Sequence, residues 1–122
     1  MGKYQKQSSP VRIPVPGNKL IEEHFGKVSS KTDDFSVAHM KAPAGWSEPA
    51  QVPDFDEITL MIKGRMRIIV DQDGVIELKA GESFVSNCGT RIQYSNPYPE
   101  DNEYWSVCIP AFTPEKAHRE ED

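Results

Sequence analysis

The sequence has no apolar run long enough to cross a membrane, few cysteines and no concentration of positive charge. A membrane-spanning helix needs about 18 or more consecutive apolar residues, and no segment approaches that length. The 14 Lys and Arg residues are scattered among 19 Asp and Glu, which gives a net charge of -5. An acidic chain without a basic stripe is poorly suited to bind polyanions. We therefore expect neither nucleic acid nor membrane as a partner.

Only two cysteines are present, Cys88 and Cys108, and the first residues are polar, without the apolar segment of a secretory signal peptide. We expect reduced thiols and a cytoplasmic location. The sequence also lacks a Ser-His-Asp order, a Cys-His pair, a phosphate-binding glycine loop and paired-cysteine zinc spacing. These absences argue against hydrolase, kinase and zinc-finger functions.

What the sequence does contain is many short apolar segments separated by turn residues. Its 122 residues suit one domain, and 10 Pro and 8 Gly divide it into short pieces. Segments of this kind at close spacing predict an all-β, antiparallel sandwich or barrel. The predicted strands are 11–15, 35–40, 58–62, 65–70, 75–78, 82–85, 91–94 and 104–109, and segment 19–25 fits a strand or a helical turn equally.

Three local features refine this prediction. Gly64 separates two strands and predicts a tight β-hairpin turn, because glycine adopts positive φ at little cost. Pro14 makes segment 11–15 an edge strand or a strand exchanged with a second copy. Thr113 and Pro114, followed by an acidic residue, have the features of a helix start, which predicts a short C-terminal helix or tail.

Two glycine-containing groups of residues stand out over roughly residues 35–110. The first is Pro43-Ala44-Gly45, Glu57 and Gly64, and the second is Gly81, Asn87-Cys88-Gly89 and Asn96. They match the two motifs of the cupin family, which the sequence resembles over this range. The resemblance implies an antiparallel jelly-roll barrel. It divides the single domain into an N-terminal arm with edge strands (1–34), the barrel (35–112) and a C-terminal tail (113–122).

Residues 55–57 with 63–64 are also similar to the cupin associated with ethanolamine utilisation, whose barrel has few metal-binding histidines. The segment Cys108-Ile109-Pro110-Ala111-Phe112-Thr113-Pro114 resembles a group of small single-domain cupins. Both similarities support the family rather than a particular reaction.

The sequence departs from the family at the metal ligands. The three histidines of the motifs fall on Gln51, Pro53 and Ile92, and only the glutamate, Glu57, is kept. The resemblance implies a bound metal in most members, but one carboxylate and one amide are too few ligands for tight binding of a transition metal. We expect no cofactor. The alternative is a divalent metal held with the help of the loop carboxylates of Glu48, Asp54 and Asp56.

Glu57 is the leading candidate for a catalytic residue. If it faces the barrel interior, as the family's glutamate does, strand alternation places Thr59 and Met61 on the same face and Ile58 and Leu60 on the other. Desolvation is then expected to raise its pKa toward the range useful to a general acid or base. The alternative is a carboxylate that anchors the loop through hydrogen bonds.

The other candidates follow from the same frame. Tyr94 shares a strand face with Ile92 and is expected in the cavity, with core packing as the alternative. His39 either acts in the pocket near neutral pH or covers the outer surface. Gln51 suits recognition of a polar substrate, and Trp46 suits stacking on it. The predicted catalytic residues are Glu57, His39 and Tyr94, and the predicted substrate-binding residues are Gln51, Trp46, Thr59, Met61 and Ile92.

Together these observations predict a cupin barrel that binds a small polar metabolite. Without a metal, the accessible catalysis is acid–base chemistry of the isomerase or lyase kind, namely isomerisation, epimerisation, dehydration or cyclisation. Two alternatives stay open: a non-catalytic ligand-binding or regulatory cupin, and a metal-dependent cupin enzyme with unusual ligands. Exchange of segment 11–15 between two copies further predicts a homodimer.

Overall fold

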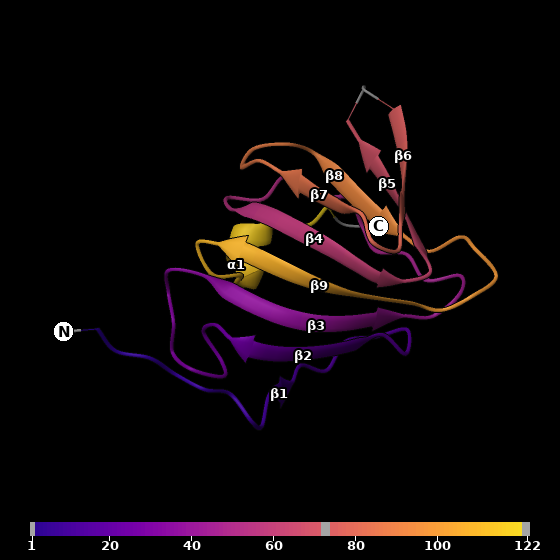
Figure 1. Ribbon diagram of the computed structural model, residues 1–122. Helices are drawn as coiled ribbons and strands as arrows, with labels where there is room; N and C mark the ends of the chain where they lie inside the picture. Colours follow the sequence, from indigo (N-terminus) through magenta and orange to yellow (C-terminus); the bar gives the residue numbers. More distant parts are fainter. Residues whose placement is uncertain (1, 72–73, 121–122) are drawn as a thin grey trace.

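Almost all regular structure in the chain is β-strand. The computed structural model describes residues 2–71 and 74–120, and within these ranges it contains nine strands and one short helix (Figure 1). The strands are β1 (Val11–Arg12), β2 (Leu20–Phe25), β3 (Ser36–Ala42), β4 (Asp56–Lys63), β5 (Arg65–Val70), β6 (Gly74–Lys79), β7 (Ser83–Ser86), β8 (Ile92–Ser95) and β9 (Asn102–Ile109). The undecided segment 19–25 is therefore largely strand, and the all-β prediction is confirmed.

The strands form two antiparallel sheets. The large sheet has the order β1-β2-β3-β9-β4-β7, and the small sheet has the order β6-β5-β8. As predicted, segment 11–15 lies at an edge: Val11 and Arg12 pair with Glu23 and Glu22 of β2, and the Ile13 backbone N–H donates to the Ile21 carbonyl at 2.9 Å. Residues 46–51 run along β8 and extend the small sheet through isolated bridges such as Gln51 to Ile92.

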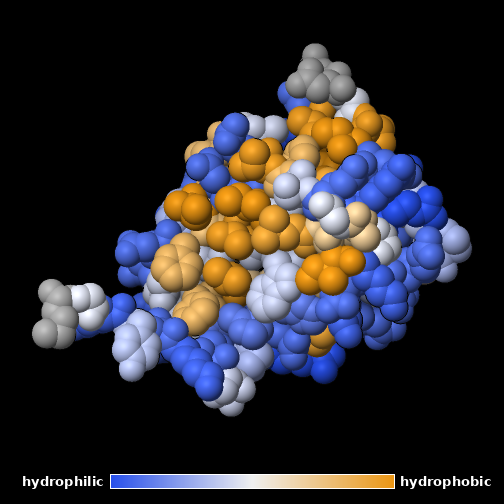
Figure 2. Space-filling model, viewed as in Figure 1, coloured by the Kyte–Doolittle hydropathy of each residue, from blue (hydrophilic) through white to orange (hydrophobic). Residues whose placement is uncertain are grey.

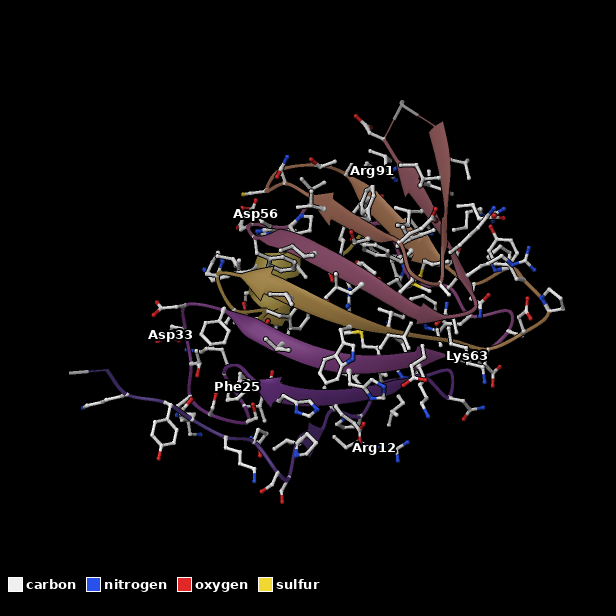
Figure 3. All side chains as sticks on the ribbon, viewed as in Figure 1. Arg12, Phe25, Asp33, Asp56, Lys63 and Arg91 are labelled. Atoms are coloured by element: carbon white, nitrogen blue, oxygen red, sulfur yellow. The ribbon has the colours of Figure 1, made fainter. Side chains whose placement is uncertain are left out.

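Side chains of the large sheet alternate between an inner face, toward the small sheet, and an outer face. Figure 3 labels Asp56 and Lys63 at the two ends of β4; between them Thr59 and Met61 are buried, whereas Leu60 and Ile62 are exposed. Because both sheets contribute to one core, that core lies between them. Its buried members are Ala42, Trp46, Met61, Met66, Ile68, Leu78, Ile92, Tyr94 and Tyr104.

The C-terminal segment packs against one end of the sheets. Helix α1 (Pro114–Ala117) begins after Thr113, whose side-chain oxygen accepts a hydrogen bond from the Lys116 backbone N–H, as the sequence predicts for a capped helix. Ala117 is fully buried in a cluster with Phe55 and Cys108. No helix in the described part of the chain is long and apolar enough to cross a bilayer.

The predicted hairpin around Gly64 is wrong. Strands β4 and β5 do not pair with each other: β4 lies between β9 and β7 in the large sheet, and β5 lies between β6 and β8 in the small sheet. Gly64, with φ +75°, carries the chain from one sheet to the other. A Cβ atom there would lie 2.7 Å from the backbone oxygen of Asp101. The glycine is therefore required by a corner between sheets rather than by a hairpin turn.

The outer face of the large sheet carries exposed apolar side chains. Figure 2 shows apolar residues gathered over β4 and the neighbouring strands on the side that faces the viewer. The exposed members of this surface are Leu60, Ile62, Val85 and Ile109. Monomeric proteins seldom expose large contiguous apolar surfaces, so this face is suited to contact with another molecule.

Replacing Gly64 by alanine tests the corner. We expect Gly64→Ala to lower the free energy of unfolding by about 2 kcal/mol or more, because it combines a positive φ with a backbone clash. Gly45→Ala is the matched control, since Gly45 also has a positive φ, +84°, but open space around its Cβ position. Urea denaturation of the two variants should show the larger loss at Gly64; equal losses would contradict the close approach.

Candidate functional site

A cavity of about 380 Å³ lies on the inner face of the large sheet. Its size falls within the usual range for sites that bind small molecules. Apolar walls come from Ile21, Met40, Phe55 and Phe112, and α1 approaches from one end. The polar and charged side chains that line it include Lys19, Glu48, Gln51, Glu57, Thr59, Tyr94, Ser106 and Arg119. The cavity is therefore mostly apolar with a set of polar groups inside it.

Glu57 is held in this cavity by two hydroxyl groups. Glu57 is the second residue of β4. It pairs with Cys108 of β9 on one side and with Ser86 of β7 on the other. Tyr94 donates a hydrogen bond to Oε1 at 3.2 Å, and Ser106 donates one to Oε2 at 2.6 Å. Three different strands thus fix one carboxylate.

The electrostatics of Glu57 favour its protonated form more than water does. Burial raises its pKa, the bonds from Ser106 and Tyr94 lower it, and the nearby carboxylate of Glu48 raises it again. The pKa lies above the ordinary value, because removal of the charge from water outweighs the two hydrogen bonds. A carboxyl with a raised pKa exchanges a proton at a pH closer to neutral, as a general acid or base requires.

The groups next to Glu57 remain protonated near neutral pH. Burial and the neighbouring Glu57 carboxylate raise the pKa of Tyr94 well above its usual range, so its hydroxyl is a donor. Burial likewise raises the pKa of the Cys108 thiol, whose Sγ lies 4.0 Å from Ser106 Oγ. The thiol is thus not a nucleophile of the activated kind. Glu57 is the group suited to proton transfer, and Tyr94 serves as a hydrogen-bond donor to it.

A second cluster of polar side chains in the cavity comes from the 46–51 segment and the C-terminal tail. Arg119 donates from Nε to the side-chain oxygen of Gln51 at 3.2 Å, and its Nη2 lies 3.6 Å from a carboxylate oxygen of Glu48. Gln51 is buried and is also bridged through its backbone to Ile92 and Arg119. The tail therefore supplies a cation to the cavity.

Lys19 supplies a second cation, from the turn that precedes β2. Only 8% of this lysine is exposed, and its Nζ lies 4.0 Å from the ring centroid of Trp46 and 5.4 Å from that of Tyr104. Burial lowers its pKa, and the carboxylates of Glu48 and Glu57 act in the opposite direction. A cation over aromatic faces is partly compensated for the loss of water.

Of the eight predicted site residues, four line the cavity: Glu57, Tyr94, Gln51 and Thr59. Trp46, Met61 and Ile92 pack in the core between the sheets instead. Trp46 contacts the cavity-lining Lys19, whose Nζ lies 4.0 Å from its ring centroid. These three do not line the cavity, and the expectation that they contact a substrate stays a prediction.

His39, for which both a catalytic role in the pocket and a place on the outer surface are predicted, does not line the cavity. Ser36, Ala38 and Met40 of β3 line the cavity, so the alternation of the strand turns His39 to the outer face. There its ring lies 5.1 Å from that of Trp105, with Nδ1 3.0 Å from Glu22 and Nε2 2.6 Å from Glu103. Burial lowers the pKa of His39, but these two carboxylates outweigh it and raise the pKa above its usual value. His39 forms a surface ion-pair cluster.

Sequence reasoning missed three residues of the site. Lys19 lies in the segment assigned to an N-terminal arm, Arg119 lies in the tail, and Ser106 sits in a strand without a motif. Glu48 was considered only as a metal ligand. Strand alternation is the one signal available in the sequence, since Ser106 lies two residues from both Tyr104 and Cys108 on the inner face of β9.

The residues present do not fit the metal that the family implies. Both oxygens of Glu57 accept hydroxyl hydrogen bonds. Of the three candidate loop carboxylates, Asp54 pairs with His118 and Asp56 accepts from the Cys88 backbone N–H, whereas Glu48 lines the cavity and lies 3.6 Å from the Arg119 guanidinium. Among residues 2–71 and 74–120, no three His, Cys, Asp or Glu side chains converge as a metal site would need. We therefore derive no chemical step through a metal.

Comparison by sequence gives a strong but partial match. No protein-family model matches the chain. The chain is 47% identical over 109 residues to a curated protein named endoribonuclease YbeY from Myxococcus xanthus (strain DK1622), a match that covers 88% of this chain. It covers only 36% of that protein, so the chain spans about a third of the relative's length. The activity in that name belongs to the longer protein.

Comparison by structure identifies the fold. An RmlC-like cupin family protein with a double-stranded β-helix fold from Methanocaldococcus jannaschii is similar at TM-score 0.68 and 17% identity, over 87% of this chain and 94% of that chain. The polyketide cyclase RemF from Streptomyces resistomycificus is similar at TM-score 0.68 and 15% identity, over 97% and 91%. With its two antiparallel sheets, the chain has the cupin fold.

Proposed function

We propose that this cupin binds a small polar metabolite in its cavity and transfers protons to and from it through Glu57 without a metal. The supporting observation is the carboxylate of Glu57, which lies in a largely apolar cavity and accepts hydrogen bonds from two hydroxyl groups. Its burial raises its pKa. Such an environment is how proteins bring a carboxyl group into the range of acid–base catalysis.

The hydrogen-bond donors around Glu57 support reactions that transfer a proton to and from the substrate. As a base, Glu57 accepts a proton from the substrate, and Tyr94 donates a hydrogen bond to it from a hydroxyl that stays protonated. Isomerisation, epimerisation, dehydration and cyclisation all require such transfers. The fold neighbour named as a polyketide cyclase supports the capacity of this architecture for cyclisation, although the likeness is of fold alone.

A non-catalytic binding cupin is the second candidate, and one observation favours it. Both oxygens of Glu57 already accept hydrogen bonds within the protein, which is the arrangement of a carboxylate that fixes the shape of a pocket. In that case Gln51 and Arg119 recognise the ligand, and Glu57 orients their surroundings without exchanging protons.

Substitution of Glu57 separates the two candidates. Ligands are first selected from small polar metabolites by their ability to raise the melting temperature, and are then incubated with the protein in D₂O. We expect the native protein to convert a ligand or to introduce deuterium into it, and Glu57→Gln to lower that rate by about 10²-fold or more while it retains binding.

The exposed residue Glu82 provides the control, because Glu82→Gln makes the same chemical change outside the cavity. Its rate should equal that of the native protein. An unchanged rate in Glu57→Gln, or ligand binding with no conversion by the native protein, would reject the catalytic form and leave the binding form.

We further propose a homodimer formed by exchange of the N-terminal edge strand. The supporting observation is the short pairing of β1, which a second copy can supply equally well. We expect light scattering to give twice the chain mass of 13.7 kDa. Removal of residues 1–12 should give the monomer, whereas Leu60→Lys on the outer face should keep the dimer. A monomeric full chain would contradict the proposal.

A further inference from the structure

We propose that Lys19 binds the anionic group of the ligand and that the ligand is a small monocarboxylate with an apolar body. This inference rests on the proposed binding function of the cavity and adds the chemical class of the ligand. The observation behind it is a lysine that is 92% buried, lines the cavity, and has neither a hydrogen bond nor an ion pair among the described residues.

The carboxylates near Lys19 are already engaged. Glu57 accepts from Tyr94 on one oxygen and from Ser106 on the other. Glu48 lies within 3.6 Å of the Arg119 guanidinium. Glu48 and Glu57 act on Lys19 through space, but neither forms an ion pair with it. The three N–H donors of the ammonium group are therefore available to a molecule in the cavity.

The groups around Lys19 stabilise the charged form of its ammonium group only partly. The rings of Trp46 and Tyr104, 4.0 and 5.4 Å from Nζ, replace some of the lost hydration. An unpaired charge in a buried site is unfavourable unless an opposite charge reaches it. Burial accordingly lowers the pKa of Lys19, and a bound anion would reverse that effect.

The rest of the cavity selects among anions. Among the described residues that line the cavity, Lys19 is the cation without an ion pair. A doubly charged phosphate would therefore face the carboxylates of Glu48 and Glu57 with one such counter-charge among these residues. The walls near Ile21, Met40 and Phe55 are apolar and accommodate a hydrocarbon portion. A ligand with one carboxylate and an apolar body suits both the single cation and the apolar walls. When its carboxylate binds to the Lys19 ammonium group, Glu57 can still act on the rest of the ligand.

The test compares a carboxylate with its uncharged analogue. Benzoate, benzamide and phenyl phosphate are titrated at pH 7 into the full-length protein by calorimetry. We expect benzoate to bind at least tenfold more tightly than benzamide and than phenyl phosphate. In Lys19→Met the preference for benzoate over benzamide should disappear, with benzamide affinity unchanged. Lys63→Met, at the exposed end of β4, is the matched control and should behave as the native protein.

Two additional readouts keep the test decisive. Without ligand, Lys19→Met should melt at a higher temperature than the native protein, because it removes an unpaired buried charge; benzoate should raise the melting temperature of the native protein but not that of the variant. If Lys19→Met fails to fold, Lys19→Arg serves instead, and it should retain the preference for benzoate.

Several results would overturn the inference. Equal affinity of the native protein for benzoate and benzamide would reject an anion site while leaving a small-molecule cavity intact. Undiminished benzoate preference in Lys19→Met would assign the anion to Arg119. Tighter binding of phenyl phosphate would replace the monocarboxylate by a phosphate ester. If none of the three probes binds, the proposed ligand class is rejected. The deuterium experiment on Glu57 tests the proposed function separately.

Discussion

Two hydroxyl groups hold the carboxylate of Glu57 in an apolar cavity, and the rest of the site is arranged around that contact. Tyr94 comes from the small sheet and Ser106 from the centre of the large sheet, so the carboxylate joins the two layers of the fold. Burial favours its neutral form and the hydrogen bonds favour its charged form. The balance, with burial dominant, raises the pKa of Glu57 above the ordinary value for a glutamate.

The cavity is completed by segments from both ends of the chain. Lys19 precedes β2, at one side of the large sheet, and Arg119 follows α1. Arg119 lies 3.6 Å from the carboxylate of Glu48, and the charges of Glu48 and Glu57 act on Lys19 through space. The N-terminal segment is therefore part of the site rather than an appendage to the barrel. A ligand would contact groups from nearly the whole length of the sequence.

Local patterns in the sequence predicted the strands and one face of β4, because alternation depends only on residues within that strand. Glu57 and Thr59 were placed correctly in this way. The position of His39 was not predictable, since Ser36, Ala38 and Met40 are no more apolar than the residues between them, and only the partner strands decide which set turns inward. The hairpin failed at Gly64 because the partners of β4 are the distant strands β7 and β9. The sequence around Lys19 is typical of a solvated turn. Its burial depends on Trp46 and Tyr104, which are distant in the sequence and which the fold brings next to it.

Acid–base chemistry at Glu57 requires a carboxyl that titrates above the ordinary value for glutamate, about 4.3. The direct measurement is an NMR titration of the side-chain carboxyl carbons, with the Glu57 signal assigned by its loss in Glu57→Gln. The account predicts a midpoint clearly above that value in the native protein. A midpoint at or below it would show that the hydroxyl bonds of Tyr94 and Ser106 dominate, and would contradict a carboxyl prepared for proton transfer.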